Sequence, residues 1–183
     1  PFEFNSPVAS EHSEGWLRFT GFGLKDTSVH HNRYGVLASF SRFAPYPKNI
    51  DSLNSKKDSI GKNLQEYKAW LNINHSQYSF SNVKSYSQCR IFYGYNKYPV
   101  NMKVFSGTKE LDKKILLPSE NLQVKKWTFN ETPPFLRFEF SGYDSPDFYA
   151  LALDGSHGVA VDNIPLRGSS GTVFTSVNQV LLQ

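Results

Sequence analysis

The sequence is poor in cysteine, with a single residue of this type among 183. One cysteine cannot form an internal disulfide, and it cannot supply the several thiolates of a zinc or iron–sulfur site. Cys89 lies in the alternating apolar stretch QCRIFYGY. That setting favours a buried structural thiol over a nucleophile.

Long hydrophobic runs are also missing. A membrane-spanning helix needs roughly 18 or more consecutive apolar residues, and no segment approaches that length. No signal peptide opens the chain, and its first residues, PFEFNS, have the character of a cloning remnant or a frayed terminus. We therefore expect no membrane span, and we expect residues 1–15 to be disordered or derived from cloning and to lie outside the fold.

The excess of one charge sign is small. The chain has 20 lysines and arginines against 16 acidic residues, a formal net charge of +4. Its basic pairs, Lys56-Lys57, Lys113-Lys114 and Lys125-Lys126, are scattered among acids. Nucleic-acid binding requires basic residues gathered on one face, so we expect no nucleic-acid partner.

Apolar and aromatic residues, by contrast, are plentiful, at 39% and 15% of the chain. The length fits one main domain. Apolar and polar residues alternate in many short stretches, which predicts strands buried on one face. The predicted strands are 16–22, 34–40, 77–83, 89–95, 100–105, 113–117, 125–129, 135–140, 149–153 and 158–161. Turn residues separate them, and this pattern predicts an all-β fold, a jelly-roll β-sandwich.

Residues 51–72 interrupt the alternation. The segment is polar, and Leu64, Tyr67, Trp70 and Leu71 recur at helical spacing. We expect a long loop with one short helix here. Residues 149–153 are expected to turn Tyr149, Leu151 and Leu153 toward the core.

Histidine and carboxylate patterns offer two candidate ligand sets. His30 and His31 would point to opposite faces of a regular strand, so they cannot grip one metal, and only His31 is retained as a ligand contact. Asp144 and Asp147 share the turn YDSPDF and could hold calcium through clustered oxygen atoms. The alternative is an ordinary turn before proline. No other cofactor is expected.

Several tyrosines lie beside glycine, proline or charged residues, where their rings would be partly exposed. Tyr34, Tyr95 and Tyr143 are the candidates for stacking on sugar faces. The alternative for each ring is core packing.

The segment DNIPLRGSSGTVFTSVNQVLL near the carboxyl end has the order strand, glycine turn and helix, with Val173, Val177, Val180 and Leu181 on one helical side. It resembles the second conserved block of the SGNH (GDSL-type) hydrolases. The resemblance implies that Gly171 supplies a backbone amide to an oxyanion hole and that Asn163 and Arg167 support the turn and contact ligand. The preceding strands resemble the jelly-roll carbohydrate-binding-like domain inserted in peptidoglycan O-acetylesterases of that family.

The family's Gly-Asp-Ser nucleophile block, its Gly-x-Asn-Asp block and its Asp-x-x-His base block are not expected in the chain. Without a serine placed beside a histidine, the chain alone is expected to be inactive. We expect residues 16–158 to form the jelly-roll domain and residues 159–183 to be a fragment of the hydrolase fold.

The resemblance implies a non-catalytic module of an exported acetylesterase, located in the periplasm or at the cell surface. Its partners would be a cell-wall or host glycan, with peptidoglycan as the first substrate class, and the remainder of an SGNH catalytic domain. The alternative is a free-standing glycan-binding or adhesion module.

Overall fold

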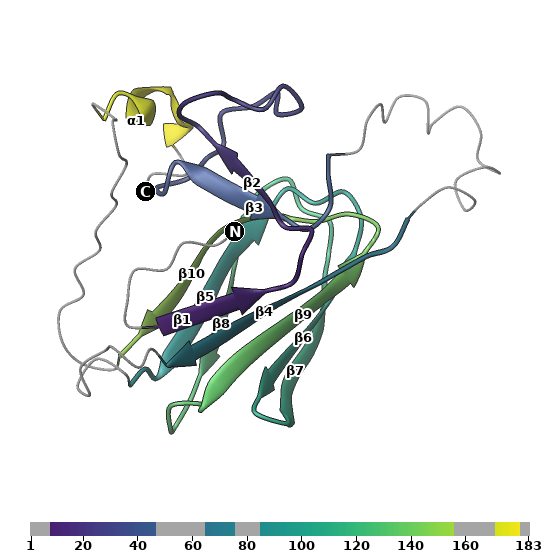
Figure 1. Cartoon of the computed structure of the whole chain (residues 1–183), viewed down its shortest axis with the longest axis vertical. Coiled ribbons are helices and arrows are strands. Elements are labelled where there is room, and N and C mark those ends of the chain that lie inside the picture. The colour runs from purple at the N-terminus through teal and green to yellow at the C-terminus, as the bar shows by residue number, and fades with distance from the viewer. Residues whose placement is uncertain (1–7, 47–64, 76–84, 156–170, 180–183) are drawn as a thin grey trace.

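A computed structural model describes residues 8–46, 65–75, 85–155 and 171–179. These residues form an antiparallel β-sandwich of two five-stranded sheets (Figure 1). The single helix among them, α1, is one turn long, Val173–Ser176. The all-β class predicted from the alternating pattern is therefore confirmed.

The first sheet has the strand order β1-β4-β9-β6-β7. Its strands are β1 Val8–His12, β4 Tyr67–His75, β9 Phe135–Gly142, β6 Val100–Ser106 and β7 Lys109–Leu116. The second sheet has the order β2-β3-β10-β5-β8. Its strands are β2 Leu17–Thr20, β3 Ser39–Arg42, β10 Asp147–Asp154, β5 Gln88–Gly94 and β8 Leu122–Thr128.

The chain passes repeatedly from one sheet to the other, as in a jelly roll. Among the described strands, β2 with β3 and β6 with β7 are the consecutive pairs that remain in one sheet. Strands distant in sequence therefore become neighbours: β9 lies between β4 and β6. This arrangement places the side chains of Trp70, Arg137 and Lys103 on the same outer face of the first sheet.

The main core lies between the sheets and follows the alternation of the strands. Val100, Met102 and Val104 of β6 are buried against Leu136, Phe138 and Phe140 of β9, as predicted. From the side of the second sheet, Trp16 packs edge-on, Phe43 stacked and Phe148 tilted against Phe140. Burying each such ring contributes roughly 1.5–3 kcal/mol, which makes this layer the main source of stability.

A second apolar cluster covers the other face of the second sheet. It contains Phe19, Tyr34, Ala38, Phe40, Tyr149 and Val177. Tyr149 was expected in the main core, but a bulge between Phe148 and Ala150 changes the alternation. Phe148 therefore packs between the sheets, and Tyr149 packs in this second cluster.

Two expectations for the amino-terminal half are wrong. Residues 8–12 do not lie outside the fold, because β1 pairs with β4 along its whole length. Residues 67–75 form a strand, not a helix or loop, because Ala69, Leu71 and Ile73 alternate with polar or amphipathic neighbours and are buried. The spacing of Tyr67, Trp70 and Leu71 is compatible with a helix. A strand period of two accounts for the burial of Ala69, Leu71 and Ile73 as well.

The carboxyl-terminal helix is shorter than predicted. It ends at Ser176, and Val177 has extended backbone angles, φ −79° and ψ 147°. Val177 is nevertheless buried in the second cluster, and the amide of Asn178 donates to the carbonyl of Asn32 at 3.0 Å. The segment thus packs on the sandwich. Val180, Leu181 and the predicted strands 77–83 and 158–161 lie outside the described residues.

Candidate functional site

The outer face of the first sheet carries an ordered set of polar and aromatic side chains. The residues that alternate with the buried core positions of β4 and β9 are Trp70, Asn72, Arg137 and Glu139. Trp70 lies directly opposite Glu139, and Asn72 directly opposite Arg137. We call these four side chains the Trp70 platform. They come from two adjacent strands in the front layer of Figure 1.

Arg137 connects the members of the platform. Its Nε donates to Glu139 Oε1 at 2.8 Å, and its Nη1 donates to Asn72 Oδ1 at 3.2 Å. The guanidinium carbon lies 4.9 Å from the centroid of the Trp70 ring. This distance is within the range of a cation–π contact. Arg137 is therefore held by three neighbours on two strands.

The Trp70 platform combines the chemical groups that bind a polar, partly apolar ligand. The side chains of Arg137 and Glu139 are 32% and 40% exposed, so their remaining donors and acceptors face solvent. Trp70 is half-buried and supplies an aromatic surface beside them. Because all four residues lie on paired strands, their positions are fixed before any ligand arrives.

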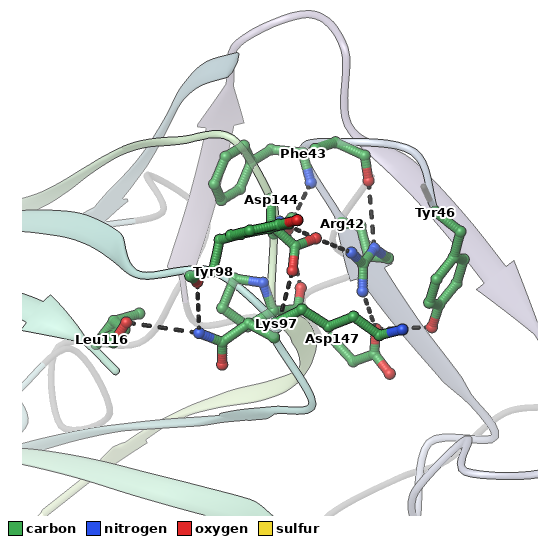
Figure 2. A network of polar contacts seen from close by, with 12 residues as sticks. Arg42, Phe43, Tyr46, Lys97, Tyr98, Leu116, Asp144 and Asp147 are labelled. Carbon is green, nitrogen blue, oxygen red and sulfur yellow. Dashed lines mark hydrogen bonds and ion pairs between the residues drawn. The ribbon is translucent and has the colours of Figure 1, made fainter. Parts of the chain in front are cut away.

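A second polar cluster lies at one end of the sandwich, where the loop before β10 meets β3 (Figure 2). Arg42 is buried there and bridges two buried carboxylates. Its Nη1 donates to Asp147 Oδ1 and its Nη2 to Asp144 Oδ1, both at 2.6 Å. The backbone amide of Lys97 also donates to Asp144, at 2.7 Å.

This arrangement corrects the calcium prediction for Asp144 and Asp147. The guanidinium of Arg42 occupies the place between the carboxylates that a cation would need, and it supplies the compensating charge itself. Among the described residues, no group of three or more histidine, cysteine or acidic side chains could hold a metal ion. The cluster is a structural ion-pair network that joins the end of β3 to the start of β10 and the loop before it.

His31 extends the buried network. The amide of Arg33 donates to His31 Nδ1 at 3.1 Å, so the neutral ring carries its proton on Nε2 and donates to Tyr46 Oη at 2.9 Å. Tyr46 in turn donates to Asp147 Oδ1 at 2.8 Å. Burial, with Arg33 and Arg42 nearby, lowers the pKa of His31 to about 4. His31 is thus bound internally as a neutral ring.

The carboxylate at the centre of this network is also perturbed. Burial raises the pKa of the Asp147 carboxyl, and the ion pair with Arg42 and the hydrogen bond from Tyr46 oppose that shift. Burial likewise raises the pKa of Tyr46 and of Tyr149. These hydroxyls remain protonated donors at physiological pH, which suits a structural network.

The three predicted sugar-binding tyrosines have different environments. Tyr34 is not presented to solvent but is buried in the second cluster against Phe40. Tyr95 is half-buried, with the guanidinium carbon of Arg33 at 4.1 Å from its ring centroid. Tyr143 is 51% exposed at the end of β9, the strand that carries Arg137 and Glu139. The structure leaves Tyr143 as the accessible ring of the three.

Gly171 precedes α1 with φ +81°, in the left-handed region that glycine adopts readily. Its carbonyl accepts a hydrogen bond from the amide of Phe174 at 3.1 Å. The predicted contacts Asn163 and Arg167 lie outside the described residues. In the part of the chain that is described, no hydrogen bond joins a serine hydroxyl to a histidine ring.

The spacing Asp-x-x-His, which the SGNH family uses for its base, occurs once, at residues 154–157. Asp154 ends β10, and its carboxylate accepts from Arg90 Nε at 3.0 Å. Asp154 is thus engaged in a cross-strand ion pair on the second sheet. His157 lies outside the described residues.

Cys89 is fully buried, as predicted, and burial raises the pKa of its thiol to about 12. A thiol with this pKa is protonated and unreactive at neutral pH. None of the helical residues described is part of a helix long and apolar enough to cross a bilayer.

The platform residues of β4 were missed from the sequence because residues 51–72 were assigned to a loop and helix. The signal that could have found them is the run of Tyr67, Ala69, Leu71 and Ile73, which has a period of two. On β9 the alternation was recognised, and Arg137 and Glu139 lie on the solvent side as predicted.

Comparison with known proteins finds a similarity in structure but not in sequence. No protein-family model matches the sequence. No curated protein matches it. Among solved structures, the chain is similar to the carbohydrate-binding module TmCBM61 in complex with β-1,4-galactotriose, at 10% sequence identity and a TM-score of 0.41, over 81% of this chain and 90% of that chain.

Proposed function

We propose that this protein is a carbohydrate-binding β-sandwich and that its ligand is bound on the Trp70 platform. The observation that carries the proposal is the fixed position of Arg137, which contacts Trp70, Asn72 and Glu139 at once. An arginine with three partners on neighbouring strands presents its free N–H groups in one orientation. A ligand therefore meets donors, acceptors and an aromatic ring in a constant arrangement.

A glycan fits these groups better than a purely apolar or purely ionic ligand. A sugar ring has an apolar C–H face, which packs on an indole, and a rim of hydroxyls that donate and accept hydrogen bonds. Arg137 supplies donors, Glu139 supplies acceptors, and Asn72 supplies both kinds of group. The four side chains come from two adjacent strands, which suits an oligosaccharide lying across the strands.

The identity of the larger protein belongs to this proposal as well. The resemblance of residues 161–182 to the second block of SGNH hydrolases supports a module of an exported esterase acting on cell-wall glycans, in the periplasm or at the cell surface. The burial of Val177 supports the alternative, a free-standing module, because a detached piece of a catalytic domain would leave that side chain uncovered. Glycan binding is common to both versions.

The binding proposal is tested by isothermal titration calorimetry with oligosaccharides that bind on an array of neutral and acidic glycans. We expect Trp70→Ala to weaken binding by about tenfold or more, because the stacking surface is lost. Arg137→Ala should weaken it by a similar factor. The matched control is Arg90→Ala, since Arg90 also pairs with a carboxylate and lies 5.6 Å from an aromatic ring, Phe92, but on the second sheet.

The control should retain the affinity of the unmodified protein. Equal affinities in Trp70→Ala, Arg137→Ala and the unmodified protein would place the ligand elsewhere and refute the platform. The absence of binding to every glycan on the array would refute the proposed function. Incubation with a chromogenic acetyl ester tests the expectation that the chain alone is inactive: turnover that is lost on replacing one serine would show that the chain is itself an esterase.

A further inference from the structure

Two lysines lie beside the Trp70 platform on the same outer face. Lys103 of β6 is directly opposite Glu139 of β9, and Lys113 of β7 is directly opposite Lys103. A single row across the sheet therefore contains Trp70, Glu139, Lys103 and Lys113. With neighbouring strands about 4.8 Å apart, Lys103 lies about 10 Å and Lys113 about 14 Å from Trp70 along this row.

The pairing of Lys103 with Lys113 is unfavourable in the protein alone. Like charges directly opposite each other in an antiparallel sheet destabilise it. The carboxylate that could offset Lys103 is Glu139, but its Oε1 already accepts from Arg137. In the described part of the chain, neither Lys103 nor Lys113 forms an ion pair. Lys103 is also half-buried.

We propose that Lys103 and Lys113 form a subsite for an anionic group of the glycan, so that the ligand is an acidic oligosaccharide. This inference rests on the proposed function and adds the ligand class. The anionic group is a carboxylate or a sulfate ester on a sugar unit next to the one stacked on Trp70. The distances along the row require a ligand longer than one sugar ring.

The charges along the row support this orientation of the ligand. The row begins with the aromatic surface of Trp70 and continues with Glu139, whose charge is offset by Arg137 in the next row. It ends with two lysines that form no ion pair with any acid among the described residues. An anion at the far end relieves the repulsion between Lys103 and Lys113 and gains a contact with each. Partly exposed charge contacts are individually weak, and the two together should correspond to about fivefold in affinity.

The test uses a pair of ligands that differ in charge alone. An oligogalacturonide is compared with the same oligosaccharide after its carboxyl groups have been reduced to primary alcohols, and a sulfated oligosaccharide is compared with its desulfated form. We expect the unmodified protein to bind the charged member of at least one pair about fivefold more tightly at low salt. The preference should shrink at high salt, because exposed charges are screened.

Variants then locate the preference. The double variant Lys103→Gln with Lys113→Gln should lose it while retaining the affinity for the neutral oligosaccharide. Lys68→Gln is the matched control, because Lys68 lies on the same sheet but is 74% exposed and paired with Glu66. Thermal unfolding of the double variant shows whether it is folded, and it should be no less stable than the unmodified protein because the repulsive pair is removed.

The outcomes separate the inference from the proposed function. If the unmodified protein binds the charged and neutral members of both pairs equally, the anion subsite is refuted and glycan binding stands. If the double variant keeps the full preference for the charged ligand, the subsite is refuted as well. If no oligosaccharide binds, the proposed function itself is wrong and the inference falls with it.

Discussion

The guanidinium carbon of Arg137 lies 4.9 Å from the centroid of the Trp70 ring, although the two residues are on different strands. Trp70 faces Glu139 across the sheet, so the contact with Arg137 is diagonal. A diagonal contact of this kind needs a long side chain that is held in one direction. The bonds from Arg137 to Glu139 and Asn72 provide that restraint.

The first prediction concerns the shape of the Arg137 side chain. Arg137→Lys keeps the charge but loses the planar fork that donates to Asn72 and Glu139 at the same time. We expect glycan affinity to fall by about tenfold in calorimetry, with the folded state retained. Arg90→Lys on the second sheet is the control and should bind as the unmodified protein does. Full affinity in Arg137→Lys would show that charge alone is sufficient.

A second prediction concerns stability and the buried ion pair. Arg42→Ala leaves the carboxylates of Asp144 and Asp147 buried without their partner, and it should lower the free energy of unfolding by about 3–5 kcal/mol. Urea denaturation followed by tryptophan fluorescence measures the change. The partly exposed pair of Arg90 and Asp154 provides the comparison, and Arg90→Ala should cost less than about 1 kcal/mol. Similar losses in the two variants would contradict the structural role of Arg42.

Strands β6 and β9 of the first sheet were predictable because each buries one face only. In β9, for example, Leu136, Phe138 and Phe140 alternate with polar residues, and a slip of one residue in the pairing register would turn all three to the solvent face. β4 was not predicted because its apolar positions, Tyr67 and Leu71, also fit a helix. The local pattern is compatible with both a helix and a strand. The segment is a strand because it pairs with β9 on one side and β1 on the other.

The candidate site was less predictable than the fold. It depends on which strands become neighbours, and β4 and β9 are separated by about sixty residues in sequence. Tyr34 and Tyr149 were misjudged for a related reason: the second sheet has an apolar cluster on its other face, and one bulge decides which face Tyr149 joins. Asp144 and Asp147 were recognised as a pair, but their partner Arg42 lies about a hundred residues earlier.

A third prediction follows for calcium. Because Arg42 neutralises Asp144 and Asp147, neither calcium nor a chelator should change the melting temperature of the unmodified protein in differential scanning calorimetry. The variant Asp147→Asn tests the pair from the other side. It should melt at a lower temperature whether calcium is present or not. A rise in melting temperature with calcium in the unmodified protein would restore the metal site.

The last prediction concerns pH and His31. A histidine in the unfolded chain has a pKa near 6.5, and in the folded protein the pKa of His31 is lowered to about 4 by burial and by the nearby charges of Arg33, Arg42 and His30. Between these pH values the unfolded state binds a proton that the folded state does not. The free energy of unfolding therefore falls as the pH decreases from 6.5 to 4, and the contribution of the neutral His31 ring is fully present above pH 6.5.

Two features set the size of this pH effect. A protonated ring cannot accept the hydrogen bond from the Arg33 amide at Nδ1, whereas the carboxylate of Asp147, 3.7 Å from Nε2, favours the charged ring. With these opposing effects, the loss should be on the order of 2 kcal/mol. His31→Gln removes the titrating group, so its unfolding free energy should vary less between pH 6.5 and 4 than that of the unmodified protein. An NMR titration of the His31 ring that gives a pKa near 6.5 would contradict the prediction.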